Sequence, residues 1–188
     1  MENQAAESAV PAQPFNRFSI PVRWGIILGV LACILTTVQH MFLIDSYGLY
    51  MTVWILSFVL SLVFYCVAGV QQRKAMGGYI TFKEAFSAIF VVILISSVIS
   101  SIYAFIYFKY IDPDVMDKLK ETTLTFMENV GAPAESIDDA AIEFDERLED
   151  SKKPGPMLLS YFKGLIIYSI FGFICAAIVK KKKPVFDA

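Results

Sequence analysis

Polar side chains within apolar stretches are the first place to look for chemistry in this sequence. His40, the single histidine of the chain, follows Gln39 near the end of one apolar stretch, and Lys163 lies inside another. A histidine here could relay protons or bind a metal, but an interfacial or interhelical hydrogen bond is the more ordinary role. Lys163 could extend its flexible stem toward lipid headgroups or pair with Asp45, or it could line a transport path. We interpret all three as candidate polar intramembrane residues, with structural roles as the leading hypothesis.

A second candidate is the stretch GGYITFKEAF at residues 77–86, which stands at the entrance to an apolar segment. Two successive glycines could form a backbone nest for an anion. Thr81 followed three residues later by Glu84 is, however, the pattern of a capping box, and Gly77 with Gly78 would supply the turn that precedes it. Since no other part of a phosphate site accompanies the glycines, we interpret the stretch as a helix start.

The remaining reactive residues do not form a recognisable catalytic or metal-binding set. The cysteines, Cys33, Cys66 and Cys175, lie in three separate apolar stretches, without the clustered spacing of a zinc site or a secreted disulfide framework. An intramembrane protease would need a nucleophile with its base, a pair of aspartates or an H-E-x-x-H motif. The sequence therefore argues against an enzyme, and it predicts no catalytic residue, cofactor or metal.

Composition places these residues in a membrane protein. The 188 residues are 56% hydrophobic and 18% charged, whereas soluble domains carry about 25% charge; the mean hydropathy is +0.58. A bilayer core is crossed by about 20 helical residues, and four segments are long enough: 24–44, 49–70, 86–108 and 157–179. A soluble bundle would need shorter apolar stretches with polar faces. The prediction is an all-α integral membrane four-helix bundle, with the first two spans joined as a tight hairpin by residues 45–48.

The segment between spans three and four predicts an extramembrane αα-hairpin. Residues 109–156 contain thirteen acidic and six basic residues. Asp112-Pro113-Asp114 has the pattern of one helix start, Ser136 with Asp139 that of a second, and 149–156 that of a linker into the fourth span. The acids favour a solvated face over weak binding of a divalent cation, because the order of a calcium loop is lacking. Residues 112–150 could bind a protein partner or a second copy of the chain.

Lysine and arginine placement predicts the orientation. Four crossings place the basic flanks of the spans on one side, which should be the cytoplasmic side. The topology anchors among them are Arg73, Lys74, Lys180, Lys181, Lys182 and Lys183. We expect a disordered cytoplasmic tail (1–22), spans one to three (23–108), an acidic periplasmic hairpin (109–156), span four (157–179) and a basic cytoplasmic tail (180–188). The lysine run follows a span directly, so we interpret it as an anchor, and no nucleic-acid partner is expected.

The order of these features resembles a known family. GGYITFKEAF opens the third span, YIDPD closes it, and an acidic hairpin precedes the fourth span. This layout, over about residues 20–184, is similar to the bacterial membrane family called domain of unknown function 4199, found mostly in Bacteroidota. The resemblance implies a four-span inner-membrane protein and no particular reaction. The leading hypothesis is a non-enzymatic structural or interaction protein (a scaffold or accessory subunit) in the lipid bilayer. The alternative is a transporter or channel subunit with a polar path near His40 and Lys163.

Overall fold

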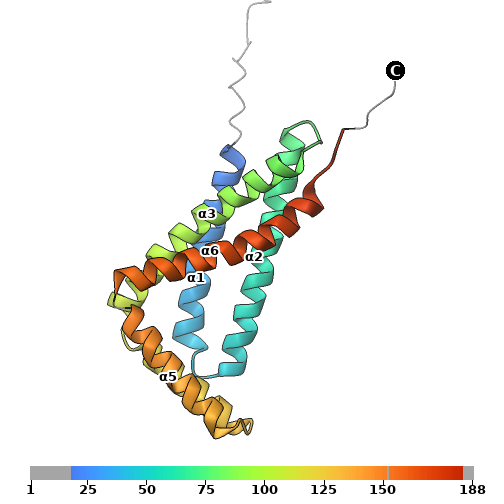
Figure 1. The fold of residues 1–188 in the computed structure, drawn as a ribbon. Coiled ribbons are helices and arrows are strands. Elements are labelled where there is room, and N and C mark those ends of the chain that lie inside the picture. Colours follow the sequence, from blue (N-terminus) through green and yellow to red (C-terminus); the bar gives the residue numbers. More distant parts are fainter. Residues whose placement is uncertain (1–17, 152, 184–188) are drawn as a thin grey trace, which may run out of the picture.

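The computed structural model describes residues 18–151 and 153–183, and almost all of them are helical (Figure 1). The elements follow one another as α1 (Ser19–Phe42), α2 (Tyr47–Ala75), α3 (Phe82–Ile106), the π-helical turn η1 (Tyr107–Ile111), α4 (Val115–Asn129), α5 (Ala134–Ser151) and α6 (Pro154–Val179). Residues 1–17 of the predicted N-terminal tail (1–22) lie outside the described residues, as do 184–188, whereas residues 19–22 are already helical in α1 and so correct that part of the prediction. The all-α prediction is confirmed.

Four of these helices are long and apolar enough to cross a membrane, as the sequence predicts. They are α1, α2, α3 together with η1, and α6 from Leu158 onward. The helices extend past the predicted apolar limits: α1 begins at Ser19 rather than at residue 24, and α2 continues to Ala75. Polar residues at a membrane surface can stay helical because the backbone hydrogen bonds remain within the segment. Even crossings bring the start of α1 and the end of α6 to the same end of the bundle (Figure 1).

Helix α3 is the centre of the bundle, since it packs against α1, α2 and α6. Its approach to α1 is especially close at two glycines. A Cβ atom added at Gly25 would lie 2.8 Å from Ile95 Cβ, and one at Gly29 would lie 2.9 Å from Ile99 Cβ. Small residues four apart allow such backbone approach in membranes. The G-x-x-x-G spacing of α1 is therefore the surface that packs on α3.

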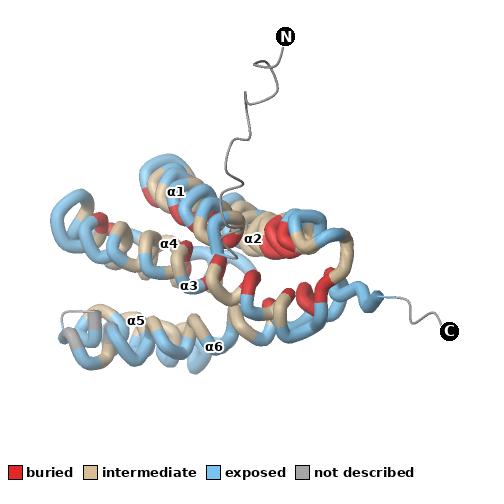
Figure 2. Tube along the Cα trace, turned by 90° about the horizontal axis from the view of Figure 1, so that it is seen from above, coloured by how far each residue is buried: buried red, intermediate tan, exposed pale blue. Residues whose placement is uncertain are grey.

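The buried core is concentrated toward the end of the bundle where α2 turns into α3 (Figure 2). Ala68 from α2, Ile89 and Val92 from α3 and Ala176 from α6 are all fully buried there. At the opposite end a smaller cluster joins Ile44, Tyr107 and Val115. Many large apolar side chains on the outside of the four helices are exposed, as expected for surfaces that contact lipid.

The hairpin between α3 and α6 is present, but its helices begin at different residues from those predicted. The Asp112 amide donates to Tyr107 O at 2.9 Å and so closes η1, which means that Asp112 ends one helix instead of starting the next. Helix α4 starts at Val115, after Asp114.

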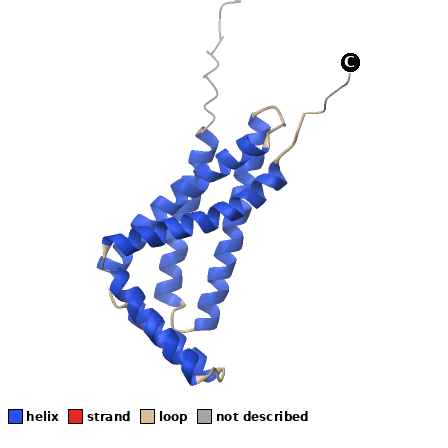
Figure 3. Cartoon of the chain, in the orientation of Figure 1, coloured by secondary structure: helices blue, strands red, loops and turns tan. Residues whose placement is uncertain are grey.

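The second predicted helix start and the predicted linker are also wrong. Helix α5 starts at Ala134, because Pro133 O already accepts the amides of Ser136 and Ile137; the predicted Ser136–Asp139 capping box therefore lies inside the helix. Helix α5 then runs to Ser151, and a proline in the first turn of α6 suits its fixed φ. Residues 149–156 are thus mostly helical, and the connections in this region are short (Figure 3).

Candidate functional site

The GGYITFKEAF stretch is built as a helix start. Gly77 and Gly78 have φ values of 82° and 89°, in the left-handed region that glycine adopts without steric cost. The Thr81 amide donates to Glu84 Oε2 at 3.0 Å, and the Glu84 amide donates to Thr81 Oγ1 at 3.3 Å. These are the two reciprocal bonds of a capping box. The glycine positions border open space, so the geometry supports a turn followed by a cap.

Two of the predicted topology anchors also make structural contacts. Arg73 Nη1 donates to Val179 O at 2.9 Å, where the last carbonyls of α6 lack partners within the helix. Lys181 pairs with the buried Ile80 through two backbone bonds of 2.9 and 3.0 Å, and its Nζ lies 5.6 Å from the Tyr79 ring centre. The end of α6 and the residues directly after it are thereby held against the loop between α2 and α3. These contacts join residues about a hundred positions apart, which no local pattern signals.

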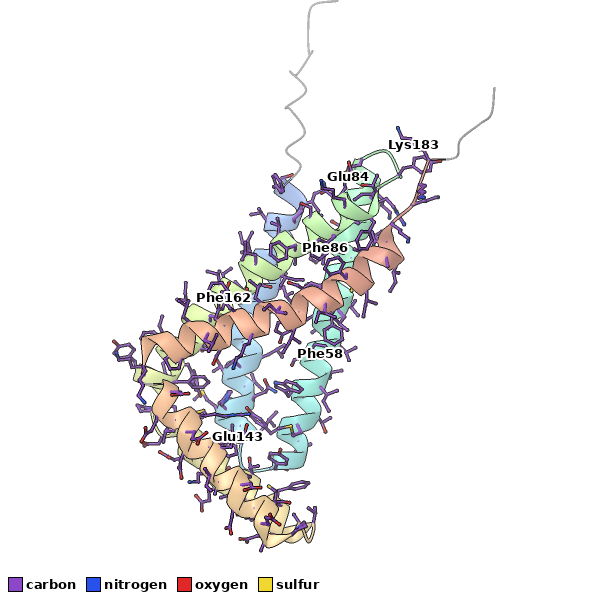
Figure 4. The ribbon with its side chains drawn as sticks, viewed as in Figure 1. Phe58, Glu84, Phe86, Glu143, Phe162 and Lys183 are labelled. Carbon is purple, nitrogen blue, oxygen red and sulfur yellow. The ribbon has the colours of Figure 1, made fainter. Side chains whose placement is uncertain are left out.

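Glu84 and Lys183 lie at this tied end of the molecule, whereas Glu143 of the hairpin lies at the other (Figure 4). Lys74, Lys180, Lys182 and Lys183 are exposed. The basic residues that the sequence assigns to one side are thus gathered at one end of the bundle.

Gln39 and His40 are buried at the opposite end, with 6% and 8% of their surfaces exposed. His40 Nδ1 lies 2.8 Å from Thr36 O, and a carbonyl can only accept, so Nδ1 carries the hydrogen. His40 Nε2 can then accept from the Tyr50 hydroxyl at 3.3 Å. The rings of Tyr50, Tyr107 and Phe108 surround the imidazole with centre distances of 5.5–5.6 Å.

A cavity of about 340 Å³ opens beside this histidine. Helix α1 contributes Thr36, Gln39 and His40, and α2 contributes Tyr50 and Trp54. The other walls come from α3, η1 and α4: Ser100, Ser101, Ala104, Phe108, Met116 and Leu119. A second hollow of about 210 Å³ continues between α1, α2, α3 and α6 and shares Thr36, Gln39, Trp54 and Ser100 with the first. Within residues 18–151 and 153–183, no Asp, Glu, Lys or Arg lines either hollow.

Lys163 does not belong to this site. It is exposed on α6, and among the described residues it forms no ion pair with Asp45. The structure therefore brings Gln39 and His40 together but leaves Lys163 apart, and the two regions do not share one polar path. Within the described chain, no group of three His, Cys, Asp or Glu residues could hold a metal ion.

The hairpin forms the second distinctive surface. Helix α4 packs on the bundle through Val115, which is fully buried, and through Phe126, whose ring centre lies 4.7 Å from that of Tyr47. Helix α5 is held to α4 by Lys120 Nζ, which lies 2.7 Å from Asp145 Oδ1. None of the side chains of α5 that the structure describes is buried (Figure 2).

Eight acidic residues of α5 are exposed, against one basic residue, Arg147. They are Glu135, Asp138, Asp139, Glu143, Asp145, Glu146, Glu149 and Asp150. At the base of the hairpin, Lys118 Nζ lies 3.1 Å from Asp112 Oδ2, and this hydrogen bond raises the pKa of Lys118. The hairpin is thus an acidic helix mounted on a second helix that is anchored to the bundle.

A family model described as Protein of unknown function (DUF4199) matches residues 23–181. The protein belongs to the DUF4199 family. The match covers the four apolar helices and the hairpin between them, so the whole bundle is a DUF4199 domain. No curated protein and no solved structure matches the chain.

Proposed function

We propose that this DUF4199 protein is a non-enzymatic accessory protein of the bacterial inner membrane. It presents α5 to a protein partner with a basic surface in the periplasm. The observation that supports the proposal is the mounting of α5: its eight acids are exposed, while its companion α4 is packed against the membrane helices. A helix held in this way loses little further freedom on binding, which favours affinity.

The orientation follows from charge. Arg73, Lys74 and the run Lys180–Lys183 lie at the end of the bundle opposite the hairpin. Lysine and arginine accumulate on the cytoplasmic side of bacterial membrane proteins. The hairpin is therefore assigned to the periplasm and both termini to the cytoplasm.

The charge of α5 also restricts the class of molecule that could be its partner. Anionic headgroups and nucleic-acid phosphates would both be repelled by a helix with eight acids and one arginine. A second copy meeting through the same face would set acid against acid, so self-association through α5 is disfavoured. A basic protein surface is complementary, and such complementarity chiefly raises the association rate and specificity.

Site-specific photocrosslinking in native membranes tests this function. We expect a crosslinker at Asp139 or Glu146 to capture a defined protein, and one at the exposed, membrane-facing Ile166 to miss it. The capture should be lost in high salt, because exposed charges are screened. With the crosslinker at Asp139, capture should also be lost in the charge-reversed double variant Glu143→Lys/Glu146→Lys, with abundance and membrane insertion unchanged. A partner captured equally well by the charge-reversed variant would contradict the proposal.

Topology is tested separately by cysteine labelling. The native cysteines lie within the apolar helices, so a cysteine introduced at Asp139 can be compared with one at Lys182. Asp139→Cys should react with an impermeant maleimide added to whole cells whose outer membrane has been permeabilised, whereas Lys182→Cys should react only after lysis. The reverse pattern would place α5 in the cytoplasm and refute the assignment.

A polar path through both His40 and Lys163 would require the two side chains to share a cavity. Lys163 lies outside the hollow that His40 lines. The geometry therefore favours the accessory role over a transporter or channel subunit of that design.

A further inference from the structure

We propose that the hollow beside His40 is a binding site for an uncharged amphipathic lipid, whose head carries hydrogen-bond acceptors such as carbonyl oxygens. The site is independent of the acidic hairpin surface. Its volume of about 340 Å³ falls within the range of about 300–1,000 Å³ typical of small-molecule pockets.

The walls specify an uncharged head. The ring nitrogens of His40 are already engaged by Thr36 O and the Tyr50 hydroxyl. Among the residues that the structure describes, no carboxylate, ammonium or guanidinium group lines the hollow. Burying a charged group without a counter-charge is strongly unfavourable, so a phosphate or carboxylate head would be rejected.

The walls also offer unused hydrogen-bond donors. In the described part of the chain, the Thr36 and Ser101 hydroxyls and the Trp54 indole N–H have no hydrogen-bond partner, although all three residues line the hollow. The Gln39 amide is more than nine-tenths buried, and its one contact, to Tyr50 O, is long at 3.5 Å. These groups would be satisfied by a ligand that accepts hydrogen bonds, which is how a small number of polar groups orients a ligand in a pocket.

The shape provides for a tail and for entry from the membrane. The adjoining hollow of about 210 Å³ is lined on α1 by Leu28, Leu31 and Leu35, and a single chain could extend along this side from the first hollow. The facing hydroxyls of Ser57 and Ser61 already donate to carbonyls of their own helix. Trp54 lines both hollows and is nevertheless 54% exposed, so it stands where the site meets the outside of the bundle. Trp54 lies about 10 Å along α2 from its first residue, at a rise of about 1.5 Å per residue, which places the entrance against lipid.

Two membrane molecules share this chemistry: a quinone with a short tail and a monoacylglycerol. Trp54 can report on either one. The chain has two tryptophans, and the indole of Trp24 lies away from the hollow, where it donates to Gln71 at 2.9 Å. In full-length Trp24→Phe protein in phosphatidylcholine vesicles, emission therefore comes from Trp54 alone. Quinone quenches the emission directly, and a monoacylglycerol quenches it when its chain is brominated.

We expect quenching of Trp54 by at least one of these probes to saturate as its mole fraction in the bilayer rises. An alkyl sulfonate with the same brominated chain should give only the linear quenching of random collisions. Saturation by quinone alone would identify the ligand as a flat ring with carbonyl acceptors. Saturation by the monoacylglycerol alone would identify it as a neutral glyceride. Saturation by both would show that the site recognises the chemistry that the two molecules share.

A filled cavity provides the matched control. Ser101→Leu, which occupies the hollow, should lose the saturable component, whereas Ser160→Leu on the exposed surface of α6 should retain it. Circular dichroism and gel filtration check that both variants fold. If Ser101→Leu does not fold, Thr36→Val provides a second, smaller change in the same hollow, and it should weaken the saturable component. Strictly linear quenching with both neutral probes, saturation by the sulfonate, or equal loss in the two leucine variants would each overturn the proposal.

Discussion

The contact between α1 and α3 gives the sharpest test of the fold. An alanine at position 25 would place its Cβ 2.8 Å from Ile95 Cβ and 3.2 Å from Val92 O. Carbon atoms in good contact are about 3.5–4.0 Å apart, so the helices would have to separate by several tenths of an ångström or more. Neither a Cβ nor a backbone carbonyl can turn aside, because neither lies at the end of a rotatable side chain.

We therefore expect Gly25→Ala to lower the free energy of unfolding by about 1–3 kcal/mol, the usual cost of an overpacked interior. The measurement is reversible unfolding in mixed micelles with increasing dodecyl sulfate, followed by far-ultraviolet circular dichroism. Gly172→Ala should cost less, since its nearest obstacle, at 2.8 Å, is the mobile Cδ1 of Ile93. In the double variant Gly172→Ala/Ile93→Val that Cδ1 atom is absent, so the destabilisation caused by Gly172→Ala should become smaller.

Gly164→Ala is the control, because a Cβ there meets nothing within 4 Å. It should leave the unfolding free energy unchanged or raise it slightly through helix propensity. If Gly25→Ala and Gly164→Ala unfolded alike, the close approach of α1 to α3 would be refuted, and with it the packing role of the glycine pair.

Three smaller changes test other contacts by the same unfolding measurement. Thr81→Ala should cost about 1 kcal/mol through loss of the cap to Glu84; an unchanged stability would refute that role. Tyr107→Phe should raise the free energy of unfolding by about 1–3 kcal/mol, because the buried Tyr107 hydroxyl has no hydrogen-bond partner in the described chain. A lower free energy of unfolding would show that this hydroxyl makes a stabilising hydrogen bond. A double-mutant cycle on Lys120 and Asp145, whose side chains are 25% and 63% exposed, should give a coupling of about 0.2–1 kcal/mol that fades in high salt; a salt-independent value would contradict a surface ion pair.

The parts of the fold that were predictable from sequence depend on composition and local chemistry. Four apolar segments longer than a bilayer is thick can hardly be anything but spanning helices. The capping box at Thr81 and Glu84 is equally local, because all its atoms lie within four residues. The structure confirms the four apolar helices and the capping box because each depends only on composition or on neighbouring residues.

The helix ends in the hairpin were predicted wrongly because several local patterns competed there. The acid–proline–acid pattern at 112–114 is typical of a helix start, but the π-helical turn before it captured the Asp112 amide. Likewise Ser136 and Asp139 fit a capping box, yet the carbonyl of Pro133 had already begun the helix. A one-dimensional pattern shows that a cap is chemically possible, and the preceding backbone decides whether it is used.

The separation of His40 from Lys163 follows from helical geometry that the sequence contains. At about 100° per residue, Gly29 and His40 are separated by only about 20° around α1, so His40 continues the face that packs on α3. Lys163 and Gly172 differ by nine residues, about 180° around α6, so Lys163 faces away from the contact that Gly172 makes with Ile93. Both residues are polar and lie within apolar stretches, and that shared feature is the whole basis for the hypothesis of a common polar path. The glycine contacts fix which side of each helix faces inward, and that orientation places the histidine beside the cavity and the lysine at the surface.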